Sequence, residues 1–242
     1  MSRGLGDVYK RQEVNVVDFG ADKKGKKDSS KAIQKALDYA IDNGSNSVQI
    51  KVVVPKGKYR IDKLLEIYSN TWLYLEDGAT IVRNFDKGCM IKNAQANGAG
   101  GYGSERNIVI EGGCWDGNPS PTSRPFSNMR FGHMKNLWIK NVEIKNNYNG
   151  HHVEIGGVKG ITIEDCDFHG YTGTFQKEAI QLDTISNSDV FPAYEPFDDT
   201  PCDNAVIKNN KFHDLIRGLG SHSACLGVYL SLIHISEPTR HS

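Results

Sequence analysis

The sequence predicts an all-β protein built as a solenoid of stacked strands, because a short phrase recurs along it. The four copies are residues 107–118 (NIVIEGGCWDGN), 136–147 (NLWIKNVEIKNN), 160–171 (GITIEDCDFHGY) and 204–215 (NAVIKNNKFHDL). Each copy contains apolar residues two apart, then a break, then another apolar residue. The copies align on four isoleucines: Ile110, Ile139, Ile163 and Ile207.

Two further columns of this alignment explain the break and the apolar residue after it. Two positions after each isoleucine stand residues of types that tolerate a left-handed backbone: Gly112, Asn141, Asp165 and Asn209. Five positions after each isoleucine stand large apolar residues: Trp115, Ile144, Phe168 and Phe212. Each copy is therefore predicted to be a strand, a tight bend and a second strand. One such unit cannot bury its apolar face alone, so the copies must stack.

Composition bounds the classes of function. The chain has 242 residues, of which 38% are hydrophobic, and no apolar run long enough to span a bilayer, so no membrane insertion is expected. Its 29 basic and 29 acidic residues cancel, which gives no electrostatic footprint for nucleic acid. The five cysteines are an odd number without metal-ligand spacing, and they do not decide the redox compartment.

The two ends of the chain share nothing with the repeat. Residues 1–12 (MSRGLGDVYKRQ) and 230–242 (LSLIHISEPTRHS) resemble translated sequencing adaptor. We therefore expect one domain over residues 13–229, a fragment truncated at its C-terminal side. A signal peptide upstream of it would not be visible.

The elements before the repeat are predicted from spacing and turn residues. Residues 14–21 alternate and then turn, and residues 28–43 have helical apolar spacing, with Asp28 or Ser29 as the N-cap and Gly44 just past the end. Residues 51–61 and 70–82 are each predicted to be a strand, a turn and a strand, the second turn being Asp77-Gly78. A helix followed by stacked strands suggests that the helix caps the open end of the solenoid.

The segments VNVVDFGADKKGKKDSSKAIQKALDYA, VVVPKGKYRI and LYLEDGATIV, followed by GGCWDGN, resemble the entry module of pectate-lyase-like proteins. The nearest group is the polygalacturonase-related glycoside hydrolases. The resemblance covers residues 13–229 and implies a right-handed parallel β-helix that acts on carbohydrate, in a secreted or cell-surface protein. The same fold carries hydrolases, lyases, epimerases and tail-spike depolymerases, so the reaction must be argued from the site.

Counting places a third strand in each coil and, with it, a candidate site. Met129-Arg130-Phe131 should stack beside Val153-Glu154-Ile155, followed by the strand that contains Ile180 and Leu182. Alternation along these strands then predicts outward-facing polar side chains that form one patch: Arg130, His152, Glu154, Gln181, Asp183 and His222. The stacking of Asp183 beside His222 assumes a register in which a slip of one residue would bury both.

Long loops leave the same predicted sheet, and residues 184–203 form the longest. Tyr194 in this loop is a candidate sugar-stacking residue, with packing onto the coil as the equal alternative. Glu154 could simply pair with Arg130. His133, His169 and His213 are expected to be plain surface residues.

The polygalacturonase pattern of aspartates is absent here, and only Glu178 keeps a carboxylate on the corresponding rungs. A glycoside hydrolase would need two carboxylates, for which the candidates are Glu154, Asp183 and Glu178, with His222 beside them. Candidate substrate-binding residues are His152, Arg130, Gln181, Lys177, Arg217 and Tyr194.

Two alternatives stay open beside hydrolysis of a uronate-containing or related polymer. A polysaccharide lyase or epimerase would use His152 or His222 as base and Arg130, Lys177 or Arg217 to neutralise a carboxylate. A non-catalytic carbohydrate-binding or tail-spike-like module needs neither. No cofactor and no metal site is predicted, and only the lyase alternative would bring in calcium. The expected partner is a polysaccharide.

Overall fold

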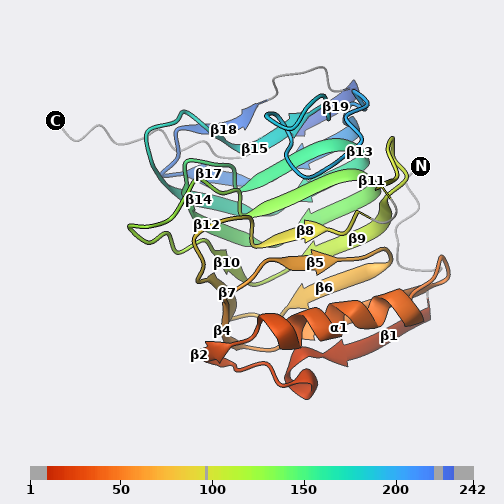
Figure 1. The fold of residues 1–242 in the computed structure, drawn as a ribbon, viewed down its shortest axis with the longest axis vertical. Coiled ribbons are helices and arrows are strands. Elements are labelled where there is room, and N and C mark those ends of the chain that lie inside the picture. Colours follow the sequence, from red (N-terminus) through yellow and green to blue (C-terminus); the bar gives the residue numbers. More distant parts are fainter. Residues whose placement is uncertain (1–9, 96–97, 221–225, 232–242) are drawn as a thin grey trace.

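The computed structural model describes residues 10–95, 98–220 and 226–231, which wind into a parallel β-helix (Figure 1). Each turn of the coil contributes strands to parallel sheets, and the described strand pairs of these sheets are parallel ladders. The right-handed parallel β-helix with an N-terminal helix that the sequence predicts is confirmed.

The strands form three faces, which we call sheets 1, 2 and 3. Sheet 1 contains β1 (Lys10–Asn15), β3 (Val48–Val54), β6 (Thr71–Leu75), β9 (Glu105–Glu111), β16 (Asp203–Lys208) and β19 (Leu226–Ser231). Sheet 2 contains β5 (Leu65–Ile67), β8 (Ile91–Asn93), β15 (Glu178–Asp183) and β18 (Arg217–Gly220). The long strands β11 (Met129–Lys140) and β13 (Val153–Glu164) run through both sheets and join them.

Sheet 3 closes the coil with β2 (Lys24–Asp28), β4 (Gly57–Ile61), β7 (Ala79–Arg83), β10 (Cys114–Asp116), β12 (Glu143–Tyr148), β14 (Asp167–Thr172) and β17 (Lys211–His213). The sequence did not predict the lysine-rich strand β2 at the edge of sheet 3, because KGKKD contains no alternating apolar residues. Strand β1 begins at Lys10 and so includes three residues of the segment assigned to the adaptor-like end. It pairs with β3 from Lys10↔Val48 onward.

The repeat columns are stacked as predicted. Ile139 pairs with Ile110 on one side and with Ile163 on the other, and Ile163 pairs with Ile207. All four are completely buried. The bend column is left-handed throughout, with φ of 78° at Gly112, 55° at Asn141, 56° at Asp165 and 57° at Asn209. The strands therefore enter sheet 3 in register, with Trp115, Ile144, Phe168 and Phe212 stacked inside the coil.

The first end of the coil is covered by helix α1 (Ser30–Asn43), which follows the short 3-10 helix η1 (Val16–Phe19). Figure 1 shows α1 lying across this end beside β1. Ala32, Ile33, Ala36, Leu37 and Ala40 are buried there, whereas Ile41, which the periodicity also suggested, is 56% exposed. Ala40 takes the inward position in that last turn. Among the described residues, no helix is long and apolar enough to cross a membrane.

The N-cap is divided between the two residues named by the sequence. Ser29 occupies the cap position, but its hydroxyl accepts from the Asp22 amide at 3.0 Å instead of capping the helix, while Asp28 Oδ1 accepts from the Ser30 amide at 2.8 Å. The helix ends at Gly44, where an added Cβ would lie 2.6 Å from the Ala40 carbonyl oxygen. Close approach therefore requires glycine at this helix end.

A ladder of asparagines holds the corner between sheets 2 and 1. Asn70, Asn107 and Asn136 have left-handed φ of 60°, 56° and 58° on successive rungs. The Asn107 amide donates to Asn70 Oδ1 at 2.9 Å, and the Asn136 amide donates to Asn107 Oδ1 at 2.9 Å. Asn70 and Asn107 are buried, so these bonds satisfy polar atoms that water reaches poorly.

We expect Asn107→Gly to lower the free energy of unfolding by about 1–3 kcal/mol, because it keeps the backbone conformation but leaves the buried Oδ1 of Asn70 without its donor. Asn209→Gly is the matched control. Asn209 has a nearly equal φ of 57° but is exposed and lies outside the ladder. Urea denaturation of both variants measures the difference, and equal losses would refute a special role for the ladder.

Candidate functional site

A groove of about 400 Å³ lies on the outer side of sheet 2. Its floor is one row of side chains, since Arg130 on β11 pairs with Glu154 on β13 and Glu154 pairs with Gln181 on β15. One wall consists of residues 125–127, residues 149–151, Phe175 and Lys177. The other wall comes from the long loop 184–203, through Asp189, Val190 and Pro192. The predicted stacking of β11, β13 and β15 thus places the site.

Glu154 is held by three hydrogen bonds at the centre of the floor. Its Oε2 accepts from the Ser127 hydroxyl at 2.7 Å, from Arg130 Nε at 2.9 Å and from Arg130 Nη2 at 2.7 Å. Burial disfavours the charge on Arg130, but the negative charge of Glu154 outweighs this and raises the pKa of the guanidinium. The pairing that the sequence offered as the alternative for Glu154 is present. This ion pair holds both side chains in place and has no net charge.

Asp183 follows the predicted register but not the predicted exposure. It lies opposite Gly156, two positions beyond the Glu154↔Gln181 pair, and is only 1% exposed. Gln181 Nε2 donates to its Oδ2. Loop 184–203 folds back over this end of β15, and the Cys202 thiol donates to the Asp183 carbonyl oxygen at 3.4 Å. Asp183 thus shares the face of Gln181, but the prediction that it is accessible is wrong, because alternation does not foresee the covering loop.

Glu178 is also drawn away from the groove. Its Oε1 accepts from Arg217 Nη1 at 3.1 Å, and its Oε2 lies 3.9 Å from His151 Nδ1. Ala179 and Ile180 both belong to the core, so alternation breaks at the start of β15. Arg217, which was predicted to neutralise a substrate carboxylate, also donates to Gln176 Oε1 at 2.8 Å. Its guanidinium is therefore bonded to both Glu178 and Gln176. His222 lies outside the described residues.

The long loop carries its own apolar cluster of Ile185, Phe191 and Tyr194. Tyr194 is completely buried, and its hydroxyl donates to Asn93 Oδ1 and to the Arg130 carbonyl oxygen, both at 3.0 Å. The prediction that Tyr194 contacts sugar is therefore wrong, and the packing alternative holds. The ring of Tyr194 packs directly against the backbone of Gly132, where an added Cβ would lie 2.5 Å from Tyr194 Cδ1.

His133 anchors the same loop and is not the surface residue that the sequence suggested. It is completely buried. Its Nδ1 lies 2.8 Å from the Gly101 carbonyl oxygen and its Nε2 lies 2.9 Å from the Pro196 carbonyl oxygen. The ring therefore connects the two loops that border this face.

The adjacent histidines point in different directions. His151 lines the groove, and its Nδ1 donates to the Glu178 carbonyl oxygen at 2.8 Å. Burial lowers the pKa of His151. His152 instead points into the coil, where its ring meets the edge of Phe168 and its Nε2 donates to the His169 carbonyl oxygen at 2.9 Å. The prediction of an outward His152 is wrong, because the chain is still turning at this corner before β13 begins.

Burial lowers the pKa of His152 to about 4, because the interior of the coil disfavours the charged ring. His152 and His151 are thus both favoured as neutral rings in the folded chain.

Phe175 is a groove residue that the sequence did not reveal. Its ring lines the groove, and the residue is 53% exposed. The preceding turn is fixed because Asn149 Oδ1 accepts from the amides of Thr174 and Phe175 at 2.8 and 2.9 Å. The Tyr171 hydroxyl also donates to the Phe175 carbonyl oxygen. The available signal was a lone aromatic in the polar stretch YTGTFQKE just before β15.

The charges that line the groove cancel. Arg130 and Lys177 supply two cations, while Glu154 and Asp189 supply two carboxylates. Lys177 is half-buried on one wall, and Asp189 is exposed on the opposite one. The groove therefore offers hydrogen-bonding groups and an aromatic face but no strong field of one sign.

The stacked coil places the chain in the class of parallel β-helix proteins. The groove lies on the sheet that β11, β13 and β15 form. Residues 13–222 match the model of the family described as "Rhamnogalacturonase A/epimerase, pectate lyase-like", and the chain belongs to this family.

Individual relatives differ in what they are named for. The chain is 27% identical to "Plasmin and fibronectin-binding protein A" of Streptococcus pneumoniae, over 89% of this chain but only 34% of that protein. A solved structure of the surface adhesin PfbA from the same organism aligns with a TM-score of 0.71 and 25% identity, covering 94% of this chain and 55% of that one. A family 28 exopolygalacturonase from Yersinia enterocolitica aligns with a TM-score of 0.67 at 17% identity, over 90% of this chain and 48% of that one. The chain thus spans about a third of its curated relative.

We expect Gly132→Ala to unseat loop 184–203, because the new Cβ would collide with the ring of Tyr194. The cost should be about 1–3 kcal/mol, and hydrogen exchange should rise selectively in this loop. Gly218→Ala is the control, since its Cβ would make only an ordinary 3.4 Å contact with Phe212. Unchanged hydrogen exchange of the loop in Gly132→Ala would show that the contact between Gly132 and the Tyr194 ring does not hold the loop in place.

We also expect stability to depend on pH through His152. Its folded-state pKa of about 4 lies below the ordinary 6.5, so the unfolded chain takes up the proton first. The stability from neutral His152 is complete above pH 6.5 and is lost as the pH falls toward 4, by about 3 kcal/mol. Urea unfolding across this range should give a flatter pH profile for His152→Phe than for the wild type. Parallel profiles would contradict the assignment.

Proposed function

We propose that this chain binds a polysaccharide in the groove on sheet 2, as a non-catalytic recognition module of a secreted or cell-surface protein. The observation that carries the proposal is Phe175, a half-exposed ring on a turn that Asn149 and Tyr171 hold in place. A fixed aromatic face beside hydrogen-bonding groups suits the apolar face and the hydroxyls of a sugar ring, and little ordering is needed on binding.

The balance of charge in the groove favours a neutral or weakly charged polymer over a polyuronate. Lys177 and Asp189 both line the groove with opposite charges, and Arg130 is paired with Glu154. A polyanion would gain from a net positive surface, which these residues do not supply.

Hydrolysis has weaker support than binding. It needs two carboxyl groups about 5–9.5 Å apart on either side of a sugar linkage. Of the predicted carboxylates that the structure describes, Glu154 alone lines the groove, and Arg130 and Ser127 occupy its Oε2. The relatives also favour recognition, since one is named a plasmin- and fibronectin-binding protein and the other a surface adhesin.

We expect Phe175→Ala to weaken binding about tenfold or more across a panel of immobilised plant and bacterial polysaccharides, because the stacking surface is lost. Ile41→Ala removes a similarly exposed apolar side chain on the capping helix and should leave binding unchanged. Lys177→Gln should change affinity for neutral polymers by less than about threefold. If Phe175→Ala binds as the wild type does, this groove is not the binding site.

The products of the same incubations separate the alternatives. A binder releases nothing, a hydrolase releases reducing ends without ultraviolet absorbance, and a lyase releases unsaturated ends that absorb. Reducing ends that disappear in Glu154→Gln or Asp183→Asn would replace the binding proposal with the paired-carboxylate hydrolase.

A further inference from the structure

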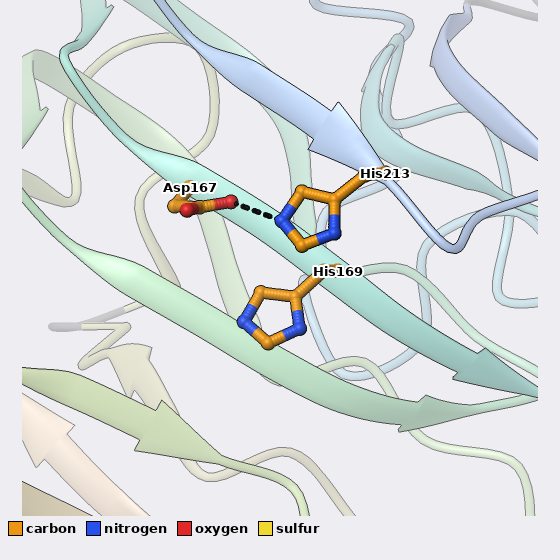
Figure 2. Close-up of side chains that lie close together, drawn as sticks. All are labelled: Asp167, His169 and His213. Atoms are coloured by element: carbon orange, nitrogen blue, oxygen red, sulfur yellow. Dashed lines mark hydrogen bonds and ion pairs between the residues drawn. The ribbon is translucent and has the colours of Figure 1, made fainter. Parts of the chain in front are cut away.

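A second cluster of side chains lies on sheet 3, outside the groove. Figure 2 shows Asp167 and His169 on β14 and His213 on β17, with the two imidazole rings lying over one another. Their ring centroids are 4.6 Å apart and their planes differ by 10°. One ligand atom from each of the three residues lies within 4.8 Å of the other two.

We propose that Asp167, His169 and His213 form a binding site for a divalent transition metal ion of the zinc class. Two imidazole nitrogens and a carboxylate oxygen are a donor set that favours Zn²⁺, Cu²⁺ or Ni²⁺ over Ca²⁺ and Mg²⁺, which prefer oxygen ligands alone.

The coil itself brings these ligands together. His169 and His213 pair directly in the parallel ladder of β14 and β17, so they occupy the same position on neighbouring rungs. Asp167 stands two residues before His169 and therefore projects from the same outer face. Because the ladder fixes the backbones, only small side-chain rotations are needed to bring the donor atoms to the roughly 2.0–2.2 Å of zinc bonds.

Neighbouring carboxylates orient both rings, as carboxylates do around histidine ligands of metals. His213 Nδ1 lies 3.1 Å from Asp214 Oδ2, which leaves Nε2 facing Asp167 Oδ1 at 2.8 Å. On the other ring, His169 Nε2 lies 3.0 Å from Glu143 Oε1 on β12, and Glu143 also pairs with Lys145. Glu143 is therefore placed as an orienting group or as a fourth ligand.

The cluster is open to solvent, so an ion can enter. The side chains of His169, His213 and Asp167 are 22%, 35% and 36% exposed. An ion held here would tie β14 to β17 and would stabilise the folded coil, since the unfolded chain does not hold the three ligands together.

The test is calorimetric titration of the full chain with ZnCl₂, together with the visible spectrum of added Co²⁺. The wild type should bind one equivalent more tightly than the double variant His169→Asn/His213→Asn, by about tenfold or more. The thermal midpoint of the wild type should also rise in excess zinc, by roughly 5 °C at a concentration 100-fold above Kd. The double variant should lose both effects.

Matched controls keep the result interpretable. Lys211→Gln changes an exposed charge on the same strand β17 and should bind zinc as the wild type does. Histidines elsewhere in the chain are retained in every variant, so their contribution cancels. If the double variant is misfolded by circular dichroism, Asp167→Asn gives the comparison instead. Zinc binding that persists unchanged in a folded variant of either kind would overturn the proposal.

Discussion

The candidate site and the metal cluster depend on one constraint, the left-handed bend that four successive rungs make at the same position. Gly112, Asn141, Asp165 and Asn209 all have left-handed φ, and the strands after them enter sheet 3 in register. Register in turn decides which side chains face the interior, because a slip of one residue would exchange the two faces of a strand. The continuous stack from Trp115 to Phe212 follows from the left-handed bend that these four rungs share.

Regular stacking also explains why two such different polar surfaces occur on one coil. Side chains at equal positions of neighbouring rungs lie about 4.8 Å apart. On sheet 2 this spacing pairs Arg130 with Glu154 and produces a neutral floor. On sheet 3 it stacks His169 on His213 and puts both beside a carboxylate. The same ladder thus satisfies charge in one place and gathers metal-binding groups in the other.

Loop 184–203 decides what the groove can do. The loop buries its own Tyr194 against Gly132, and it covers Asp183, a carboxylate that the strand pattern alone would leave accessible. The groups that line the groove include the Glu154–Arg130 pair, the oppositely charged Lys177 and Asp189, and the ring of Phe175. A recognition surface fits these groups better than a pair of carboxylates that exchange protons.

The sequence by itself determined the coil, the bend column, the inward isoleucines and the capping helix, because each depends on local backbone preference and on a spacing that repeats. It also placed Arg130, Glu154 and Gln181 in one row, since that row needs only the rung length. The tertiary structure alone decided four features: the inward turn of His152, the burial of Tyr194, the burial of Asp183 and the anchoring of His133. They depend on how a long loop and a chain corner pack against distant rungs, and no periodic pattern in the sequence encodes that packing.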